Sequence, residues 1–317
     1  MKSLSGRNRF HLLIAGVILL LFFPSAGCRR GGPSSEPAEK TPPARIVSVV
    51  PSVTETLFAL GLGDRVVGVS DYCKYPPEAN GLPKLGGLYN PNIERIVELR
   101  PDLAVLLREH RELEEKLGRA GIKTLSVDHA SVAGILNSFV EIAARCGVPD
   151  AGAALRGECE ERLEKLRVIA GGKPVSVLLV LDRDLGERGV REVYAAGKNR
   201  YFNDLLRLAG ASNVLADAAS AVPTLSREGI IGLKPDVILD LSSLGAVPDE
   251  DAAELEELYR HDWDSFADSV PAVRDGRVYP ILADYATVPG PRFVRFAELL
   301  SGILHPRPSP EPGHSGL

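Results

Sequence analysis

The sequence is poor in the residues and spacings that common enzyme and metal sites require. Its 317 residues include only 4 Cys, 1 Met and 1 Trp, and aromatic residues make up 6% of the chain. No pair of cysteines has the CxxC spacing of a structural zinc site. The HExxH helix, the Walker loop and the GxSxG elbow are also absent. These absences argue against a zinc protein, a P-loop nucleotidase and a serine hydrolase.

Positive charge and long apolar runs are scarce beyond the first 27 residues. Three of the 37 Lys and Arg residues lie within 1–27, whereas all 42 Asp and Glu residues follow it, so the remainder carries a net charge of −8. A surface this acidic does not follow a phosphate backbone, and we expect no nucleic-acid partner. No later apolar run approaches the roughly 20 residues that span a bilayer. The sequence therefore does not describe a channel or a permease.

The N-terminal residues have the composition of an export signal. Basic residues come first, an almost wholly apolar run covers 10–23, and small residues precede Cys28. This order is typical of a signal peptide over 1–27 rather than of a stable membrane span. Because Cys28 follows Ala-Gly, the stretch resembles a bacterial lipoprotein signal, in which that cysteine is acylated. Ser25 stands where such signals usually carry Leu, so ordinary signal cleavage is the alternative.

Two segments offer little apolar surface to bury. Residues 28–44 are rich in Pro, Gly, Ser and charged residues, which predicts a flexible tether. A lipid at the start of this tether would hold the folded body at a membrane surface, in the periplasm or on the cell surface, without embedding it. Residues 305–317 have a similar composition and are expected to form a disordered tail.

From Arg45 onward, hydrophobic runs alternate with breaker residues. Ser52 and Glu55 have the spacing of a capping box at a helix start, and Asn92 is placed to cap another helix. Repeated strand–helix alternation is the sign of a parallel α/β sheet. The first half is expected to contain strands at 45–50, 65–69, 102–107 and 122–127, and helices beginning at Ser52 and covering 92–99 and 109–120.

Parts of this pattern recur later in the chain. Residues 92–107 (NIERIVELRPDLAVLL) parallel residues 226–241 (SREGIIGLKPDVILDL). Residues 57–67 likewise resemble residues 205–215. Internal repetition of a supersecondary unit predicts two related α/β lobes, each with its own sheet.

The two predicted lobes span 45–130 and 173–304, with a helical linker over 131–172 between them. An apolar stripe and two flanking glycines predict one long helix over 150–170 inside this linker. Such a helix would be about 31 Å long, enough to cross from one lobe to the other. One stiff connection opposes a wide hinge closure, so we expect ligand-bound and empty forms to differ by a modest tilt.

Cysteine and histidine show no metal-binding pattern. Beyond Cys28, an odd number of cysteines (Cys73, Cys146 and Cys159) permits at most one disulfide, and Cys159 fits an apolar helical stripe as a small core residue. His129 follows a predicted strand end, where it either faces a cleft as a ligand or is held by hydrogen bonds within the scaffold. We therefore predict no metal site and no cofactor.

The most specific part of the sequence is residues 45–106, followed by shorter motifs further on. The chain resembles the helical-backbone periplasmic binding proteins, the cobalamin, ferric-siderophore and haem group that feeds ABC importers. The resemblance covers about residues 45–303, and "DYCKYPPEA" and "NIERIV" look nearest the cobalamin-binding branch. The matching motifs are "SVVPSVTE", "VGVSDYCKYPPEA", "NIERIVELRPDL", "SREGIIGLKPDVIL" and "PGPR".

The resemblance implies a partner. In that family one glutamate on each lobe docks onto arginines of a dimeric ABC permease, and motif alignment places these at Glu94 and Glu228. Their matched places in the repeat suit a partner with two-fold symmetry. The alternative is that each glutamate reaches back to its helix cap, Asn92 or Ser226. The binding protein itself is expected to be a monomer.

Ligand residues follow from the rule that open α/β sheets bind ligands beyond the carboxyl ends of their strands. Tyrosine faces would pack on a flat macrocycle, and Asp284 could accept hydrogen bonds from ligand amides. Arg108 and Arg183 would equally suit the carboxylates of haem or of an anionic ferric chelate. The predicted ligand residues are Pro51, Ser52, Tyr72, Leu88, Tyr89, Arg108, Arg183, Asp284 and Tyr285.

Together these features predict an α/β protein of two Rossmann-like lobes, each with a mostly parallel sheet, joined by a single long helix. We expect a membrane-tethered, extracytoplasmic solute-binding lipoprotein that captures a metal chelate, most simply a corrinoid such as cobalamin, and delivers it to an ABC permease. Haem or a ferric siderophore is the alternative ligand. An exported chelatase is a rival from another class, but it should focus a base or metal ligands on one strand end. A lipoprotein that only scavenges or adheres is a third possibility.

Overall fold

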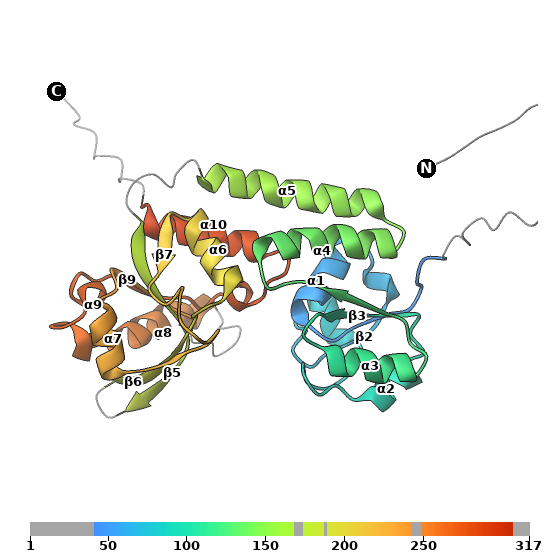
Figure 1. Cartoon of the computed structure of the whole chain (residues 1–317), viewed down its shortest axis with the longest axis horizontal. Helices are drawn as coiled ribbons and strands as arrows, with labels where there is room; N and C mark the ends of the chain where they lie inside the picture. The colour runs from blue at the N-terminus through green and yellow to red at the C-terminus, as the bar shows by residue number, and fades with distance from the viewer. Residues whose placement is uncertain (1–40, 168–173, 187–188, 242–248, 307–317) are drawn as a thin grey trace, which may run out of the picture. The chain divides into compact units, whose positions relative to one another are not determined.

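The computed structural model describes residues 41–167, 174–186, 189–241 and 249–306, without the side chains of residues 249–252 (Figure 1). The predicted signal peptide 1–27, the lipidation site Cys28, most of the predicted tether and residues 307–317 of the predicted tail lie outside the described residues. The backbone just before the first strand is held by hydrogen bonds, because the amides of Ala44 and Arg45 both donate to Oδ2 of Asp102 at 2.9 Å.

The first lobe contains a wholly parallel four-stranded sheet. Its strand order is β2-β1-β3-β4, and every side chain of β1 and β3 is buried. Burial on both faces explains why these strands are continuous apolar runs without polar alternation. The strands are β1 (Ile46–Ser48), β2 (Val66–Val69), β3 (Leu103–Leu107) and β4 (Thr124–Val127), and the helices are α1 (Pro51–Ala59), α2 (Ile93–Glu98) and α3 (Arg111–Arg119). All the predicted elements of this lobe are present, with bounds within two residues of the predicted ones.

The predicted helix caps have different outcomes. The side chain of Asn92 accepts a hydrogen bond from the Arg95 amide, so this cap is confirmed. The capping box of Ser52 and Glu55 is wrong, because α1 begins one residue earlier at Pro51, with Val50 at the cap. Proline suits the first helical position, since its φ is already helical and it has no N–H to satisfy.

The second lobe contains a six-stranded mixed sheet. Its order is β10-β9-β5-β6-β8, with β7 paired to β5. β5 runs parallel to β7 and β9, and β9 parallel to β10, whereas β6 is antiparallel to β5 and β8. The strands are β5 (Val175–Gly186), β6 (Gly189–Ala195), β7 (Ala211–Asn213), β8 (Thr224–Ser226), β9 (Val237–Asp240) and β10 (Val278–Pro280). The lobes are therefore related α/β units, but their sheets are not identical.

The internal repeat is visible in the backbone. In the first lobe α2 leads into β3, and in the second α7 (Arg227–Leu233) leads into β9. The residue before the proline of each repeat has a positive φ, 45° at Arg100 and 47° at Lys234. A non-glycine residue rarely adopts this conformation, so its occurrence at the same place supports a shared helix-to-strand turn.

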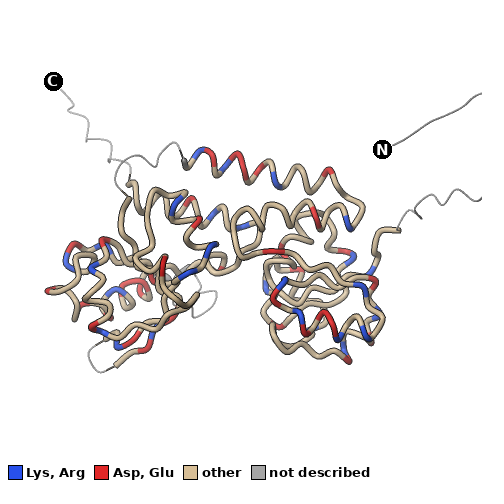
Figure 2. Tube along the Cα trace, viewed as in Figure 1, with Lys and Arg blue, Asp and Glu red and all other residues tan. Residues whose placement is uncertain are grey.

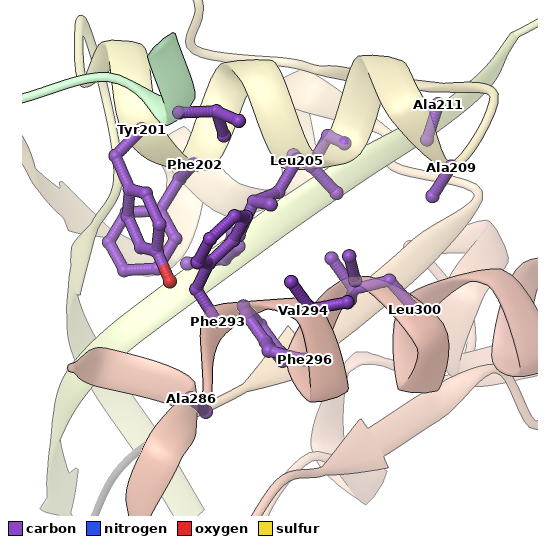
Figure 3. Packing of buried hydrophobic residues seen from close by; sticks show 14 of the residues in the cluster. Tyr201, Phe202, Leu205, Ala209, Ala211, Ala286, Phe293, Val294, Phe296 and Leu300 are labelled. Carbon is purple, nitrogen blue, oxygen red and sulfur yellow. The ribbon is translucent and has the colours of Figure 1, made fainter. Parts of the chain in front are cut away.

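Helices cover the second sheet. They are α6 (Arg200–Leu208), α7, α8 (Asp249–His261), α9 (Pro271–Arg274) and α10 (Phe293–Leu304). Two of them, α6 and α10, contribute to its larger hydrophobic core. Figure 3 shows side chains of α6 and α10 facing one another. Phe202 and Phe296 meet edge to face there, with ring centroids 6.5 Å apart. This packing sets the position of α10, whose N-terminus contributes to the cavity described below.

Two helices, not one, connect the lobes. The predicted helix 150–170 corresponds to α5 (Pro149–Arg167), whose last three predicted residues lie outside the described residues, and α4 (Val132–Arg145) lies alongside it (Figure 1). The first half of α4 belongs to the core of the second lobe, and its last turn belongs to the core of the first. The two cores are therefore tied together by packed side chains as well as by the backbone, which strengthens the physical reason for expecting a modest tilt.

Basic and acidic residues alternate along α5 (Figure 2). Arg156 pairs with Glu160 and Lys165 with Glu161, each at 2.8 Å and one helical turn apart. Arg162 reaches across to α10, where both of its bonds to the Glu298 carboxylate measure 2.8 Å. Within the described residues no helix is both long enough and apolar enough to cross a membrane.

The three cysteines beyond Cys28 are buried and unpaired. Cys159 is 2% exposed and packs in the core of the second lobe, as its helical stripe predicts. Burial raises the pKa of its thiol to about 12, so this cysteine is an inert core residue.

Candidate ligand-binding site

A cavity of about 450 Å³ is lined by residues of both lobes. The first lobe contributes the N-terminus of α1 and the loops that follow β2 and β3. The second lobe contributes five residues of the segment that precedes α10: Asp284, Thr287, Val288, Pro289 and Arg292. The carboxyl ends of parallel strands thus supply most of the first-lobe wall, as expected for an open α/β sheet. Its volume is in the ordinary range for small-molecule sites.

Six of the nine predicted ligand residues line this cavity: Pro51, Ser52, Tyr72, Leu88, Tyr89 and Asp284. Arg108 and Tyr285 lie beside it, each next in sequence to a lining residue. The Arg108 side chain is 62% exposed and 3.9 Å from Asp128, and the Tyr285 ring lies 5.8 Å from the Arg292 guanidinium.

Arg183 is the one predicted ligand residue that lies away from the cavity. Its side chain is 3% exposed and forms ion pairs with Asp240 at 2.9 Å and Asp262 at 2.6 Å. It also covers the Tyr259 ring at 4.3 Å. The prediction placed Arg183 at a strand end, but β5 continues to Gly186 because β6 pairs with it. Arg183 therefore belongs to a buried ion-pair group of the second lobe, and we withdraw it as a ligand residue.

Three tyrosines of the cavity are unusually exposed. The fractions are 59% for Tyr72, 36% for Tyr75 and 83% for Tyr89. Gathered apolar rings that the fold leaves uncovered mark a binding surface, and tyrosine combines a flat face with a polar tip. This wall can pack against one face of a flat ligand larger than the cavity itself.

Arg292 joins the two lobes at the floor of the cavity. Its Nε and Nη2 donate to the Glu55 carboxylate of α1 at 3.0 and 2.6 Å, and its Nη1 donates to both oxygens of Asp284 at 2.8 and 3.0 Å. Its guanidinium also lies 3.7 Å from the Tyr75 ring centroid. Burial raises the pKa of Glu55, and Arg292 opposes that rise. The guanidinium is therefore already neutralised by protein carboxylates.

Glu55 and Arg292 are not among the predicted site residues, although both lie in motifs that carry the family resemblance. Glu55 ends "SVVPSVTE" and Arg292 ends "PGPR". Gly290 in the second motif permits their contact, because a Cβ there would lie 3.1 Å from the Glu55 carboxylate and 3.2 Å from the Ser52 backbone. Each motif contains one of the two residues. An ion pair between residues 237 positions apart cannot, however, be recognised from a local sequence pattern.

His129 has the scaffold role that was one of its two sequence interpretations. It is 5% exposed; its Nδ1 lies 2.9 Å from Ser52 Oγ, and its Nε2 lies 2.8 Å from Ser138 Oγ. The Ser138 hydroxyl donates to the Ile135 carbonyl, so it accepts from Nε2, and Nδ1 accepts from Ser52. Burial lowers the pKa of His129 to about 4. A neutral histidine thus holds Ser52 at the cavity wall.

This arrangement predicts a pH dependence of stability. Because the folded pKa of His129 lies below the ordinary value of 6.5, the unfolded chain binds its proton first, and stability falls as the pH drops from about 6.5 to about 4. The expected loss from this group is about 2 kcal/mol at pH 5. Urea unfolding of the wild type and His129→Gln at pH 7 and pH 5 should show a smaller pH effect in the variant. His261→Gln is the matched control, because His261 is exposed and its hydrogen bond to Asp264 raises its pKa. It removes a contribution of the opposite sign, so the fall in stability from pH 7 to pH 5 should become larger in this variant, not smaller.

The ionised groups that line the cavity are mostly acidic. Glu55, Glu109 and Asp284 stand against Lys74 and Arg292. Within the described ranges no group of three His, Cys, Asp or Glu side chains could hold a metal ion. The cavity can therefore hold a ligand by ring stacking, hydrogen bonding and complementary shape.

The predicted docking glutamates lie at equivalent places. Glu94 and Glu228 are exposed in the first turns of α2 and α7. The Ser226 hydroxyl donates to Glu228 at 2.9 Å, which matches the capping interpretation for this residue. The backbone amide and Ser226 lower the pKa of Glu228, so it remains charged and displayed.

The chain is similar to proteins that bind small molecules for transport. It is 29% identical to an ABC transporter substrate-binding lipoprotein, YvrC of Bacillus subtilis, over 84% of this chain and 82% of that protein. The structure of the vitamin B12 binding protein BtuF of Vibrio cholerae is 26% identical, with a TM-score of 0.69 over 83% of this chain and 97% of that one. The heme-binding protein RhuT of Roseiflexus sp. RS-1 is 27% identical, with a TM-score of 0.66 over 82% and 97%. Residues 46–285, which hold both sheets and most of the cavity lining, match the family described as Periplasmic binding protein, and the chain belongs to that family.

Proposed function

We propose that this protein captures a metal chelate outside the cytoplasm, most simply a corrinoid, and delivers it to an ABC permease. The observation that carries the proposal is the cavity lined by both lobes, whose walls contain exposed tyrosines and an arginine that Glu55 and Asp284 already neutralise. A corrinoid presents a flat ring edged with neutral amides, which suits tyrosine faces and carboxylate acceptors. No bond needs to be made or broken, so the role is binding and transfer rather than catalysis.

The charge of the cavity lining favours a corrinoid over haem and ferric siderophores. Haem and many ferric siderophores bring carboxylates or other anionic groups, which favour arginines in fork geometry. Here the buried arginine is occupied, and the lining carries three carboxylates against two cations. Haem remains the second candidate, because the exposed Arg108 lies beside the cavity and a heme-binding protein is among the similar structures.

Calorimetric titration of the purified protein with cyanocobalamin, ferric haem and a ferric siderophore tests this order. We expect cyanocobalamin to bind most tightly. Tighter binding of haem or of the siderophore would replace the corrinoid without changing the transport role. Binding of none of the three would contradict the proposal of a metal chelate.

Removal of a cavity ring should weaken ligand binding without harming the fold. Tyr89 is 83% exposed, so Tyr89→Ala should leave the unfolding free energy nearly unchanged. Loss of one stacked ring should cost about 1 kcal/mol of binding free energy, five- to tenfold in affinity. Calorimetry with cyanocobalamin measures this, and Tyr194→Ala, at an exposed tyrosine away from the cavity, is the control. Equal affinity in the wild type and Tyr89→Ala would mean that the cleft is placed on the wrong residues.

The proposal also includes a lipid anchor at the N-terminus and a docking surface for the permease. Acylation of Cys28 would anchor the chain, and the similarity to a protein named as a lipoprotein supports this. Mass spectrometry of the mature N-terminus separates an acylated Cys28 from ordinary signal cleavage. Glu94 and Glu228 would dock on the permease.

A further inference from the structure

Two buried histidines lie near the cavity, and their hydrogen bonding differs. Both ring nitrogens of His129 are bonded to serine hydroxyls. His110 lines the cavity and is 7% exposed, yet its Nδ1 has no hydrogen-bond partner among the described residues. Buried polar atoms without partners are rare in native proteins. A scaffold role therefore explains His129 but leaves His110 unexplained.

The surroundings of His110 keep its ring neutral. The residue stands at the N-cap of α3, where the positive end of the helix dipole opposes an imidazolium. Burial lowers the pKa of His110, and Glu109 only partly offsets this. A neutral imidazole keeps a lone pair on one ring nitrogen, which is the form in which histidine binds a metal.

The neighbouring side chains favour His110 as a donor to a metal held in the cavity. The carboxylates of Glu55 and Asp284 are both engaged by Arg292. The exposed Tyr89 ring meets His110 edge to face, with centroids 5.9 Å apart and the planes at 84°. The ring that would stack on a flat chelate thus lies next to the imidazole. Imidazole nitrogen also suits iron and similar transition metals better than a carboxylate does.

We propose that His110 coordinates the metal ion of the captured chelate at an exchangeable axial position. This inference rests on the proposed function. In the step, the bond between the metal and its axial water breaks, a bond between the metal and an imidazole nitrogen of His110 forms, and the water leaves without electron transfer. The protein thereby distinguishes chelates with an exchangeable axial ligand from those whose axial position is blocked.

Two cobalamins separate this inference from the proposed function. Aquocobalamin carries an exchangeable water on cobalt, whereas cyanide blocks that position in cyanocobalamin. We expect both to bind the full chain, but only aquocobalamin should show the displacement of its visible absorption bands that accompanies replacement of water by a nitrogen ligand. Its affinity should exceed that of cyanocobalamin at least tenfold.

The variant His110→Ala should lose the spectral change, and its affinity for aquocobalamin should fall at least tenfold further than its affinity for cyanocobalamin. His261→Ala is the matched control, because His261 is exposed and distant in the chain from every lining residue. His110→Gln repeats the measurement with a larger polar side chain if His110→Ala does not fold.

The outcomes are distinct. Aquocobalamin binding without a spectral change, or with the same change in His110→Ala, overturns the coordination while the proposed function stands. If neither cobalamin binds, the proposal of a corrinoid ligand is wrong. The same variants are then titrated with ferric haem. A ferric haem spectrum that is identical in the wild type and His110→Ala, or no haem binding at all, also overturns the coordination.

Discussion

Reversal of the two glutamates proposed to dock on the permease, Glu94→Lys with Glu228→Lys, is expected to abolish uptake of the ligand while leaving its binding within a few-fold of the wild type. Both side chains are exposed in the first turns of equivalent helices, and neither lines the cavity. Each introduced lysine would face a basic permease surface, and such a juxtaposition of like charges costs several kcal/mol of binding free energy. The measurement is uptake in a strain that lacks its own binding protein, with calorimetry on the same purified variant.

The matched control reverses two other exposed glutamates, Glu98 on α2 and Glu254 on α8. Glu98→Lys with Glu254→Lys changes the net charge by the same amount, so general electrostatic repulsion would affect both double variants alike. Glu228 also lies near a helix N-terminus, where a carboxylate is mildly stabilising. Urea unfolding of both double variants shows whether a loss of stability contributes to the loss of uptake. Normal uptake by the Glu94 and Glu228 variant would show that the pair only caps its helices.

The first lobe could be predicted from sequence because its physics is local. Strands buried on both faces are unbroken apolar runs, and β1 and β3 end where the predicted runs end, within two residues. The internal repeat made the helix–strand unit of the second lobe predictable as well. The positive φ at both Arg100 and Lys234 shows that the two repeats adopt the same turn. Local signals of this kind survive folding because tertiary contacts reinforce them.

The failures share a different cause, which is long-range pairing. Glu55 has the right spacing for a capping box with Ser52, but Arg292 binds it instead, 237 residues away. Arg183 appeared to follow a strand, but pairing with β6 extends β5 past it. His110 carries no local mark at all, because its significance depends on burial beside Tyr89. The site could thus be predicted where it follows strand ends and not where the second lobe completes it.

Removal of the Arg292 side chain is expected to cause the largest loss of stability of any single change at the cavity. The Arg292 side chain is 10% exposed and its partner Glu55 is 2% exposed, so Arg292→Ala leaves a carboxylate buried without its cation. Breaking a buried ion pair by removing one partner costs about 3–5 kcal/mol. Urea unfolding at pH 7 measures the loss. Arg162→Ala is the control, because its pair with Glu298 is more exposed and should contribute about 1 kcal/mol or less.

The pH dependence of that loss identifies Glu55 as its cause. Burial already raises the pKa of Glu55 in the wild type, and without Arg292 it should rise further. A raised folded pKa means that the folded state binds the proton first, so the loss should be greatest at pH 7 and shrink towards pH 5 as Glu55 becomes neutral. The double variant Glu55→Gln with Arg292→Met should recover much of the stability at pH 7, since neither buried charge remains. A loss below about 1 kcal/mol, or one equal at both pH values, would mean that the pair contributes little to holding the lobes together.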